Sequence, residues 1–161
     1  MSLDNIFVDA HSQMGIGRAN NEDTLKVLDW INDPNTPDSF SANLTENDLP
    51  KLFLLADGVG GHEHGARASR ESIVTIQAQF DANVSDFNIA AGISAAHTKL
   101  NLEPQTQMRQ MGTTIVGLVI SSRSTLIFNV GDSRAYSLRG KKLNLVSIDD
   151  VDDTKPKNFI T

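Results

Sequence analysis

Short apolar runs separated by glycine and polar residues dominate the first part of the chain. Ile6 to Ala10 is typical of a strand, and Gly15-Ile16-Gly17 breaks it because glycine adopts backbone angles that other residues avoid. Residues 23–31 alternate loosely as a second strand. Lys51 to Ala56 forms a nearly continuous apolar run, which favours a strand buried on both faces. The last of these strands would end at Asp57.

Residues 32–50 have a different character. They contain three prolines together with asparagine, aspartate and serine, a composition that favours turns over regular elements. We therefore predict that this segment is a surface loop inserted between two strands.

Apolar spacings of three and four residues follow Asp57 and predict two amphipathic helices. The two stripes are Ser69, Ile73, Ile76 and Phe80, and then Ile89, Ile93, Ala96 and Leu100. They predict helices over about 65–81 and about 86–102, with ends uncertain by a few residues.

The rest of the chain has the pattern of two β-hairpins. Residues 112–120 and 126–130 flank a turn at 121–124, and residues 135–138 and 143–147 are joined through Arg139-Gly140-Lys141. Strands, then two helices, then more strands predict an α+β fold built on antiparallel sheets.

Composition narrows the class of protein. With 161 residues, 39% hydrophobic and 21% charged, the chain suits one soluble domain with its own core. A net charge of -6 does not support general binding to nucleic acid or to an anionic membrane. We expect a cytoplasmic protein, because the start has no signal-like pattern and no stretch approaches the ~18 apolar residues of a membrane span.

The absence of cysteine excludes disulfides, thiolate zinc sites and a cysteine nucleophile. Three segments instead place carboxylates beside small residues, in loops or at strand ends: residues 17–23, 56–62 and 129–134. Each segment alone is weak evidence, because an Asp-Gly pair that closes an apolar strand is more often just a turn. Carboxylate oxygens are ligands for Mg²⁺ or Mn²⁺, so the three together suggest a site for hard divalent ions.

Taken in order, these segments resemble the signature of the PPM (type 2C) family of metal-dependent serine/threonine phosphatases, bacterial type. The matching elements are Arg18 with Glu22-Asp23, Asp57-Gly58-Val59-Gly60-Gly61-His62 with Val59 at a methionine position, Gly112-Thr113-Thr114, and Gly131-Asp132-Ser133-Arg134. The resemblance runs from about Asp9 to Ser147.

The resemblance implies a fold and a domain organisation. It predicts one PPM-type domain over 1–161, an α-β-β-α sandwich of antiparallel sheets flanked by helices. The family completes its metal centre with an Asp-Gly and an Asp-Asn element, and neither follows Ser147. Asn158-Phe159-Ile160-Thr161 resembles the entry to a later strand. We therefore expect that the C-terminal part is missing and that sheet edges are exposed where further strands would pair.

The resemblance also implies roles for individual residues. Asp57 would bridge two Mg²⁺ or Mn²⁺ ions, the Glu22 carboxylate and the Gly58 carbonyl would bind one of them, and Asp132 would help to bind a further, weaker ion. An Asx-type turn of Asp132 with Ser133 could operate together with this role.

Two more residues receive catalytic roles by the same resemblance. The planar guanidinium of Arg18 would bind the phosphoryl group, although it could be an ordinary surface arginine. His62 would protonate the leaving group, although His62 and His64 could instead orient their loop.

The remaining polar residues have simpler interpretations. We expect His11 and His97 to be structural, and Asn20 and Asn21 to act in caps or turns. The acidic cluster of Asp149, Asp150, Asp152 and Asp153 could recruit metal, but we interpret it as a solvated loop.

Three hypotheses about function follow. The first is hydrolysis of phosphoserine and phosphothreonine on proteins by metal-activated water, opposing a serine/threonine kinase, because phosphomonoester hydrolysis without cysteine needs charge neutralisation and an activated nucleophile. The second is a catalytically incomplete regulatory or phosphoprotein-binding module of the same fold. The third is a structural domain whose glycine-rich loops are turns.

Overall fold

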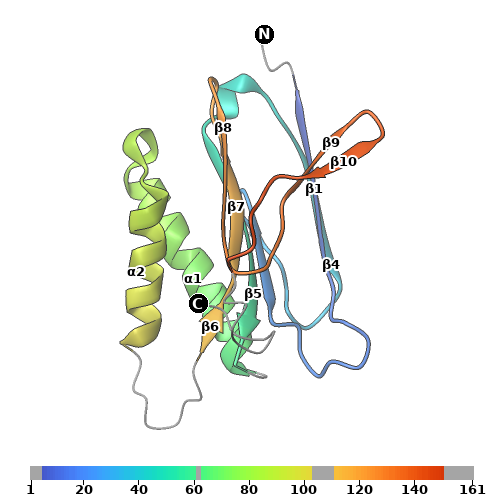
Figure 1. Cartoon of the computed structure of the whole chain (residues 1–161), viewed down its shortest axis with the longest axis vertical. Helices are drawn as coiled ribbons and strands as arrows, with labels where there is room; N and C mark the ends of the chain where they lie inside the picture. The colour runs from blue at the N-terminus through green and yellow to red at the C-terminus, as the bar shows by residue number, and fades with distance from the viewer. Residues whose placement is uncertain (1–4, 61–62, 103–110, 151–161) are drawn as a thin grey trace.

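A six-stranded antiparallel sheet lies at the centre of the computed structural model, which describes residues 5–60, 63–102 and 111–150 (Figure 1). Its main path runs β3-β2-β5-β7-β8, and β6 pairs with the end of β5. The strands are β2 (Asp23–Val27), β3 (Trp30–Ile31), β5 (Lys51–Val59), β6 (Gly112–Thr113), β7 (Ile115–Ile120) and β8 (Thr125–Val130). The predicted hairpin around residues 121–124 is confirmed, since β7 and β8 pair from Ile115↔Val130 to Ile120↔Thr125.

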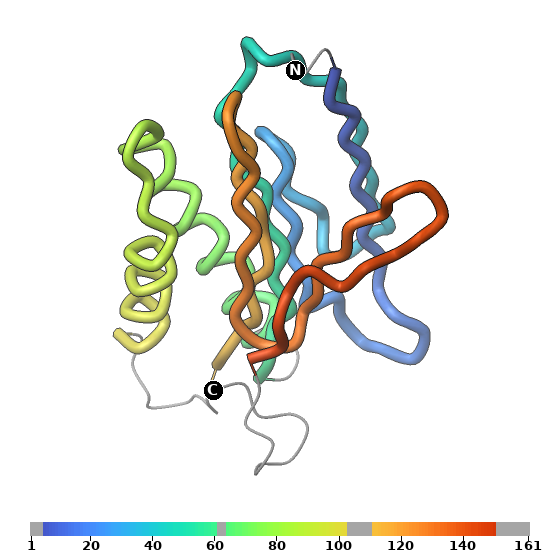
Figure 2. The backbone as a smooth tube through the Cα atoms, turned by 45° about the horizontal axis from the view of Figure 1, so that its top comes forward, coloured from blue at the N-terminus to red at the C-terminus, as the bar shows by residue number. Residues whose placement is uncertain are grey.

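Two helices cover one face of this sheet, and two separate strand pairs lie beyond the other face (Figures 1 and 2). The helices are α1 (Glu63–Ala82) and α2 (Ile89–Asn101), which confirms both predicted helices with small shifts of their ends. The strand pairs are β1 (Ile6–Ser12) with β4 (Asp38–Leu44) and β9 (Tyr136–Arg139) with β10 (Lys142–Leu145). Short 3₁₀ turns occupy Glu46–Asp48 and Val84–Asp86.

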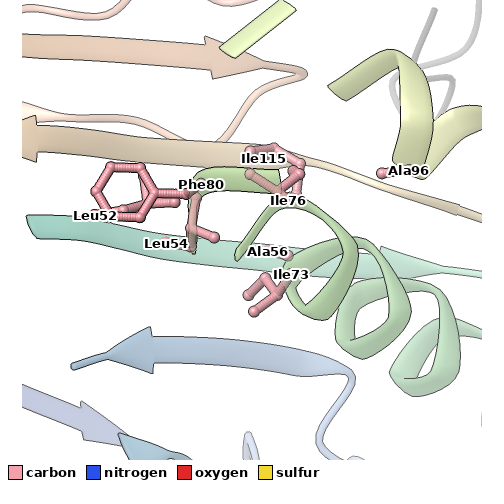
Figure 3. Close-up of a cluster of buried hydrophobic side chains, with 8 residues drawn as sticks. All are labelled: Leu52, Leu54, Ala56, Ile73, Ile76, Phe80, Ala96 and Ile115. Carbon is pink, nitrogen blue, oxygen red and sulfur yellow. The ribbon is translucent and has the colours of Figure 1, made fainter. Parts of the chain in front are cut away.

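The core lies between β5 and the helices (Figure 3). Leu52, Leu54 and Ala56 alternate along β5 and are at most 3% exposed, as a strand with one fully buried face requires. Ile73 and Ile76 of α1 are fully buried against them. The other face of β5 is only half-buried, so the prediction that both faces are buried is wrong.

The prediction of a surface loop over residues 32–50 is wrong for the segment that forms β4. This strand pairs with β1 over seven residues, from Ile6↔Leu44 to Ser12↔Asp38. Phe40 on β4 stacks on Trp30, with ring centroids 5.6 Å apart. The strand therefore depends on a distant partner and on packing, which its local composition does not reveal.

The α+β class with antiparallel sheets is confirmed. Residues 5–60, 63–102 and 111–150 supply one helix layer, and they contain no second helix layer outside the β1–β4 and β9–β10 pairs. No helix in these segments combines the length and apolar character that a bilayer crossing requires.

Candidate metal centre

The backbone of Asp57 is held on both sides near the end of β5. Its N–H donates to Thr114 Oγ1 at 3.0 Å, and its carbonyl accepts from the Thr114 N–H at 2.9 Å. The Thr113 hydroxyl donates to the same carbonyl at 3.0 Å. On the other side, Asp57 is the cross-strand partner of Asp23 on β2. The carboxylate of Asp57 therefore projects from a fixed piece of backbone.

Carboxyl groups from two other segments lie near Asp57. Burial raises the pKa of Asp57 to about 6, and the charge of Asp23, its hydrogen bond with Asp57, and the charges of Asp132 and Glu22 all act in the same direction. Glu22 and Asp23 precede and begin β2, whereas Asp132 follows β8. The fold thus gathers the three acidic segments singled out in the sequence.

Asp23 and Asp57 share a hydrogen bond between their side chains. Burial raises the pKa of Asp23, but the bond from Asp57 and the positive charge of Arg18 both oppose this rise. Ionising two adjacent carboxyl groups is unfavourable because the charges repel. Without a cation, Asp57 is therefore the residue that holds the proton and donates it to Asp23.

Glu22 and Gly58 meet at the start of α1, where Gly65 leaves the necessary space. A Cβ atom on Gly65 would collide with Glu22 Oε2 and lie 2.9 Å from the Gly58 carbonyl oxygen. Both oxygens therefore face the same small region. They are the two oxygens that the sequence assigned to a single ion.

The backbone of Glu22 is anchored by the sheet and the helix together. Its carbonyl accepts from the Gly58 N–H at 3.2 Å and from the Ser69 hydroxyl at 2.7 Å. Ser69 is fully buried and lies 2.9 Å from Thr24 Oγ1. Because Ser69 has one proton and gives it to Glu22, Thr24 is the donor in the second bond.

The loop that carries Asp132 is tied to two other segments. Ser133 Oγ lies 2.7 Å from Thr114 Oγ1, and Arg134 makes a bidentate ion pair with Asp149, with Nη2 to Oδ2 at 2.6 Å. The pairing with Arg134 lowers the pKa of Asp149. Asp149 and Asp150 lie in the loop that follows β10, as the solvated-loop interpretation of the acidic cluster expects, while Asp152 and Asp153 lie outside the described residues.

The other predicted site residues are placed as follows. Arg18 lies in an exposed turn closed by its N–H donating to the Gly15 carbonyl at 3.1 Å, and it is close enough to Asp23 to lower the pKa of that carboxyl group. His62 lies outside the described residues. Asn21 acts in a turn, as predicted, because its Oδ1 accepts from the Asp23 N–H at 3.1 Å.

Sequence reasoning placed Asp23 and Thr114 within matched motifs but assigned neither a role in the site. The Glu-Asp dipeptide at 22–23 was a visible signal for Asp23, but only the strand register places Asp23 opposite Asp57. Thr114 carries no charge, and its role depends on a long-range hydrogen bond to Asp57. The sequence pattern contained no local signal for that contact.

The donor chemistry of this cluster fits a hard divalent cation. All the candidate side-chain donors are carboxylate oxygens, and their mutual repulsion around Asp57 is what a bound cation would relieve. The described residues alone do not supply a full set of ligands for such an ion. Among residues 5–60, 63–102 and 111–150, no group of three or more histidine, aspartate or glutamate side chains is arranged to hold one metal ion.

Comparison with known proteins connects this chain to a family. The family model described as protein phosphatase 2C matches residues 32–155. The serine/threonine protein phosphatase PstP of Mycobacterium tuberculosis is 29% identical over 149 residues, covering 88% of this chain and 24% of that protein. The serine/threonine phosphatase stp of Listeria welshimeri is 28% identical over 111 residues, covering 63% of this chain and 44% of that protein.

Solved structures share the fold. The serine/threonine phosphatase of S. agalactiae gives a TM-score of 0.70 at 22% identity, covering 98% of this chain and 67% of that one. The catalytic domain of PstP in complex with two manganese ions gives a TM-score of 0.66 at 24% identity, covering 91% of this chain and 57% of that one. The chain spans less than half of the length of PstP of M. tuberculosis and of stp of L. welshimeri.

Proposed function

Because the chain belongs to the protein phosphatase 2C family, we propose that it hydrolyses phosphoserine and phosphothreonine side chains of proteins with the help of divalent metal ions. The observation that supports this proposal best is the convergence on Asp57 of acidic groups from two distant segments, residues 22–23 and residue 132. A phosphate monoester repels a carboxylate cluster, so such a site suits this reaction only when cations neutralise it.

The geometry supports the assignment of four residues to hold Mg²⁺ or Mn²⁺. Glu22 Oε2 and the Gly58 carbonyl face one region beside Gly65, and Asp57 directly precedes Gly58 in β5. Asp132, whose charge raises the pKa of Asp57, would serve a further ion. When bound, such ions neutralise charge on the phosphoryl group and lower the pKa of water so that it can attack phosphorus.

Two side chains would act on the substrate directly. Arg18 is exposed and close to Asp23, so its guanidinium can bind phosphoryl oxygens beside the carboxylates. The general acid that protonates the leaving oxygen is assigned to His62, which remains a prediction from the sequence. We also propose a cytoplasmic location and a serine/threonine kinase that the enzyme opposes.

A second candidate function is a phosphoprotein-binding or regulatory module of the same fold. It is favoured by one observation, namely that the described residues do not arrange three acidic or histidine side chains around one ion. Such a module would retain Arg18 for the phosphoryl group but would not turn over.

Hydrolysis of p-nitrophenyl phosphate and of a phosphothreonine peptide, measured with and without Mn²⁺, tests the proposal. We expect Mn²⁺-dependent turnover that Asp57→Asn abolishes. Asp81→Asn, which makes the same change at an exposed position on α1, should leave turnover intact. Saturable Mn²⁺ binding without turnover would favour the binding module, and a chain that binds no Mn²⁺ would contradict the proposed phosphatase activity.

A further inference from the structure

The hydroxyl group of Thr114 connects two segments that carry candidate metal ligands. Thr114 is 1% exposed and lies between β6 and β7. Its Oγ1 accepts from the Asp57 N–H at 3.0 Å and lies 2.7 Å from Ser133 Oγ. Ser133 directly follows Asp132. The buried Thr114 Oγ1 is therefore hydrogen-bonded both to Asp57 and to Ser133, the neighbour of Asp132.

The proton count of these groups fits a continuous chain of hydrogen bonds. The Asp57 N–H can only donate, so Thr114 Oγ1 must accept from it. Thr114 Oγ1 retains its own proton and a second lone pair, and either can serve the bond with Ser133. No solvent reaches Thr114 to replace a lost partner, because the residue is buried. Loss of the hydroxyl would leave the Asp57 N–H without this acceptor.

The methyl group of Thr114 also shapes the Asp132 loop. Gly131 adopts a φ of +94°, and a Cβ atom there would lie 2.8 Å from Thr114 Cγ2. Asp132 is therefore positioned through two features of one side chain, a hydrogen bond to Ser133 and a close contact with Gly131. The hydroxyl alone reaches both Asp57 and Ser133.

From these contacts we infer that Thr114 is a positioning residue that sets the placement of Asp57 relative to Asp132. Through it, a cation bound at one of these carboxylates changes the position of the other. This inference rests on the proposed metal-dependent function, but the coupling itself is a property of the polypeptide. Thr114 does not need to touch an ion or a substrate to have this effect.

Three variants separate the hydroxyl from the rest of the side chain. Thr114→Val keeps the shape and removes the hydroxyl, whereas Thr114→Ser keeps the hydroxyl and removes the methyl group that contacts Gly131. Ser133→Ala breaks only the link to the Asp132 loop. Thr75→Val is the matched control, because it removes a threonine hydroxyl bonded to the Glu71 carbonyl within α1.

The first measurement is Mn²⁺ binding by calorimetry on the full chain. We expect Thr114→Val to weaken apparent Mn²⁺ affinity by about 10-fold or more, the range typical of groups that orient metal ligands. Thr114→Ser should restore affinity to within about 3-fold of the parent, and Thr75→Val should not change it. If Thr114 acts through Ser133, Ser133→Ala should have less effect in the Thr114→Val background than in the parent.

The second measurement is amide hydrogen exchange in the metal-free protein, which keeps the inference separable from the proposed function. Thr114→Val should speed exchange at Asp57 and at residues 131–134, and Thr114→Ser should not. Parental affinity and parental exchange in Thr114→Val would overturn the inference. If the parent binds no Mn²⁺, the proposed function fails, and the exchange result alone decides whether the two segments are coupled.

Discussion

Asp57 is subject to opposing physical demands. Its backbone N–H and carbonyl are both satisfied by Thr114, while its side chain is surrounded by other acidic groups. A buried or crowded carboxyl group is easier to keep protonated than ionised, which explains the raised pKa. The rigid backbone prevents the side chain from escaping this repulsion. Ionisation of Asp57 therefore has an electrostatic cost, which a bound cation would remove.

This cost should appear as a pH dependence of stability in the metal-free protein. The pKa of Asp57 is raised from 3.8 to about 6, so the native state binds the proton more tightly than the unfolded chain does. The free energy of unfolding should therefore fall as the pH rises from about 4 to about 6, and stay low above that. Although desolvation raises this pKa, the side chain still has an exposed surface that water screens, so we expect a loss on the order of 1–2 kcal/mol.

Urea unfolding in EDTA at several pH values measures this effect, with Asp57→Asn as the test. The amide cannot ionise, so the variant should lose most of this slope and be more stable than the parent at pH 7. Asp23, whose pKa is also raised, accounts for any slope that remains. Saturating Mn²⁺ should reverse the order, since only the parent gains binding energy. An unchanged slope in Asp57→Asn would contradict the raised pKa of Asp57.

Gly65 is the residue where a single methyl group should have the largest local effect on the site. Its Cβ would collide with Glu22 Oε2, so Gly65→Ala must displace that carboxylate. We expect apparent Mn²⁺ affinity to fall by about 10–100-fold, as for other changes that misorient a ligand. Alanine favours a helix more than glycine does, but the new Cβ would also lie 2.9 Å from the Gly58 carbonyl oxygen, so circular dichroism is needed to check that the variant keeps the fold.

Gly92→Ala is the control for that substitution. It makes the same change in α2, where the new Cβ would lie 3.4 Å from the Phe87 ring and far from any candidate ligand in the chain. Calorimetric titration with Mn²⁺ should show parental affinity for Gly92→Ala. Parental affinity in Gly65→Ala as well would mean that Glu22 does not bind the ion.

At the scale of elements, the helices and most strands could be predicted from local pattern. The stripes on α1 and α2 are strong because a helix repeats its buried face every three or four residues. β4 was missed because it is polar, lies between prolines and is stabilised by pairing with β1. Its alternating half-buried pattern is visible only when the partner strand is known.

The packing of α1 on β5 should dominate the stability of this region. Ile76 is fully buried in the core cluster with Leu54 and Ile115, so Ile76→Ala removes apolar contacts and leaves a cavity. We expect the free energy of unfolding to fall by about 2–5 kcal/mol in urea denaturation. Val74→Ala on the same helix, at a side chain that is 43% exposed, should cost far less. Similar losses for the two variants would contradict the observed packing of α1.

At the scale of the whole molecule, the order of the three acidic segments indicated a shared site, and the fold does bring them together. Family resemblance supplied that step, because residues 22, 57 and 132 are too far apart in sequence for any local pattern to relate them. The contributions of Asp23, Gly65 and Thr114 were not visible for the same reason. Each acts through strand register or close packing, which are properties of the folded chain.

The β9–β10 pair presents an apolar surface to solvent. Cross-strand partners Leu138 and Leu143 are 66% and 62% exposed, and the next pair on the same face, Tyr136 and Leu145, are each 49% exposed. Within the described residues, neither outer edge of this pair bonds to another strand. Exposed edges and contiguous apolar side chains favour association between copies.

We therefore expect the chain to self-associate as its concentration rises, and the double variant Leu138→Lys/Leu143→Glu to reduce this association. The two new side chains would face each other across the strands with opposite charge, so the hairpin should be retained while its surface becomes polar. Sedimentation velocity over a range of concentrations measures the effect. Leu102→Lys, which adds a charge at a single exposed leucine after α2, is the control and should associate like the parent. If the double variant also associates like the parent, contacts between copies involve another surface, such as the open edges of β1 and β4.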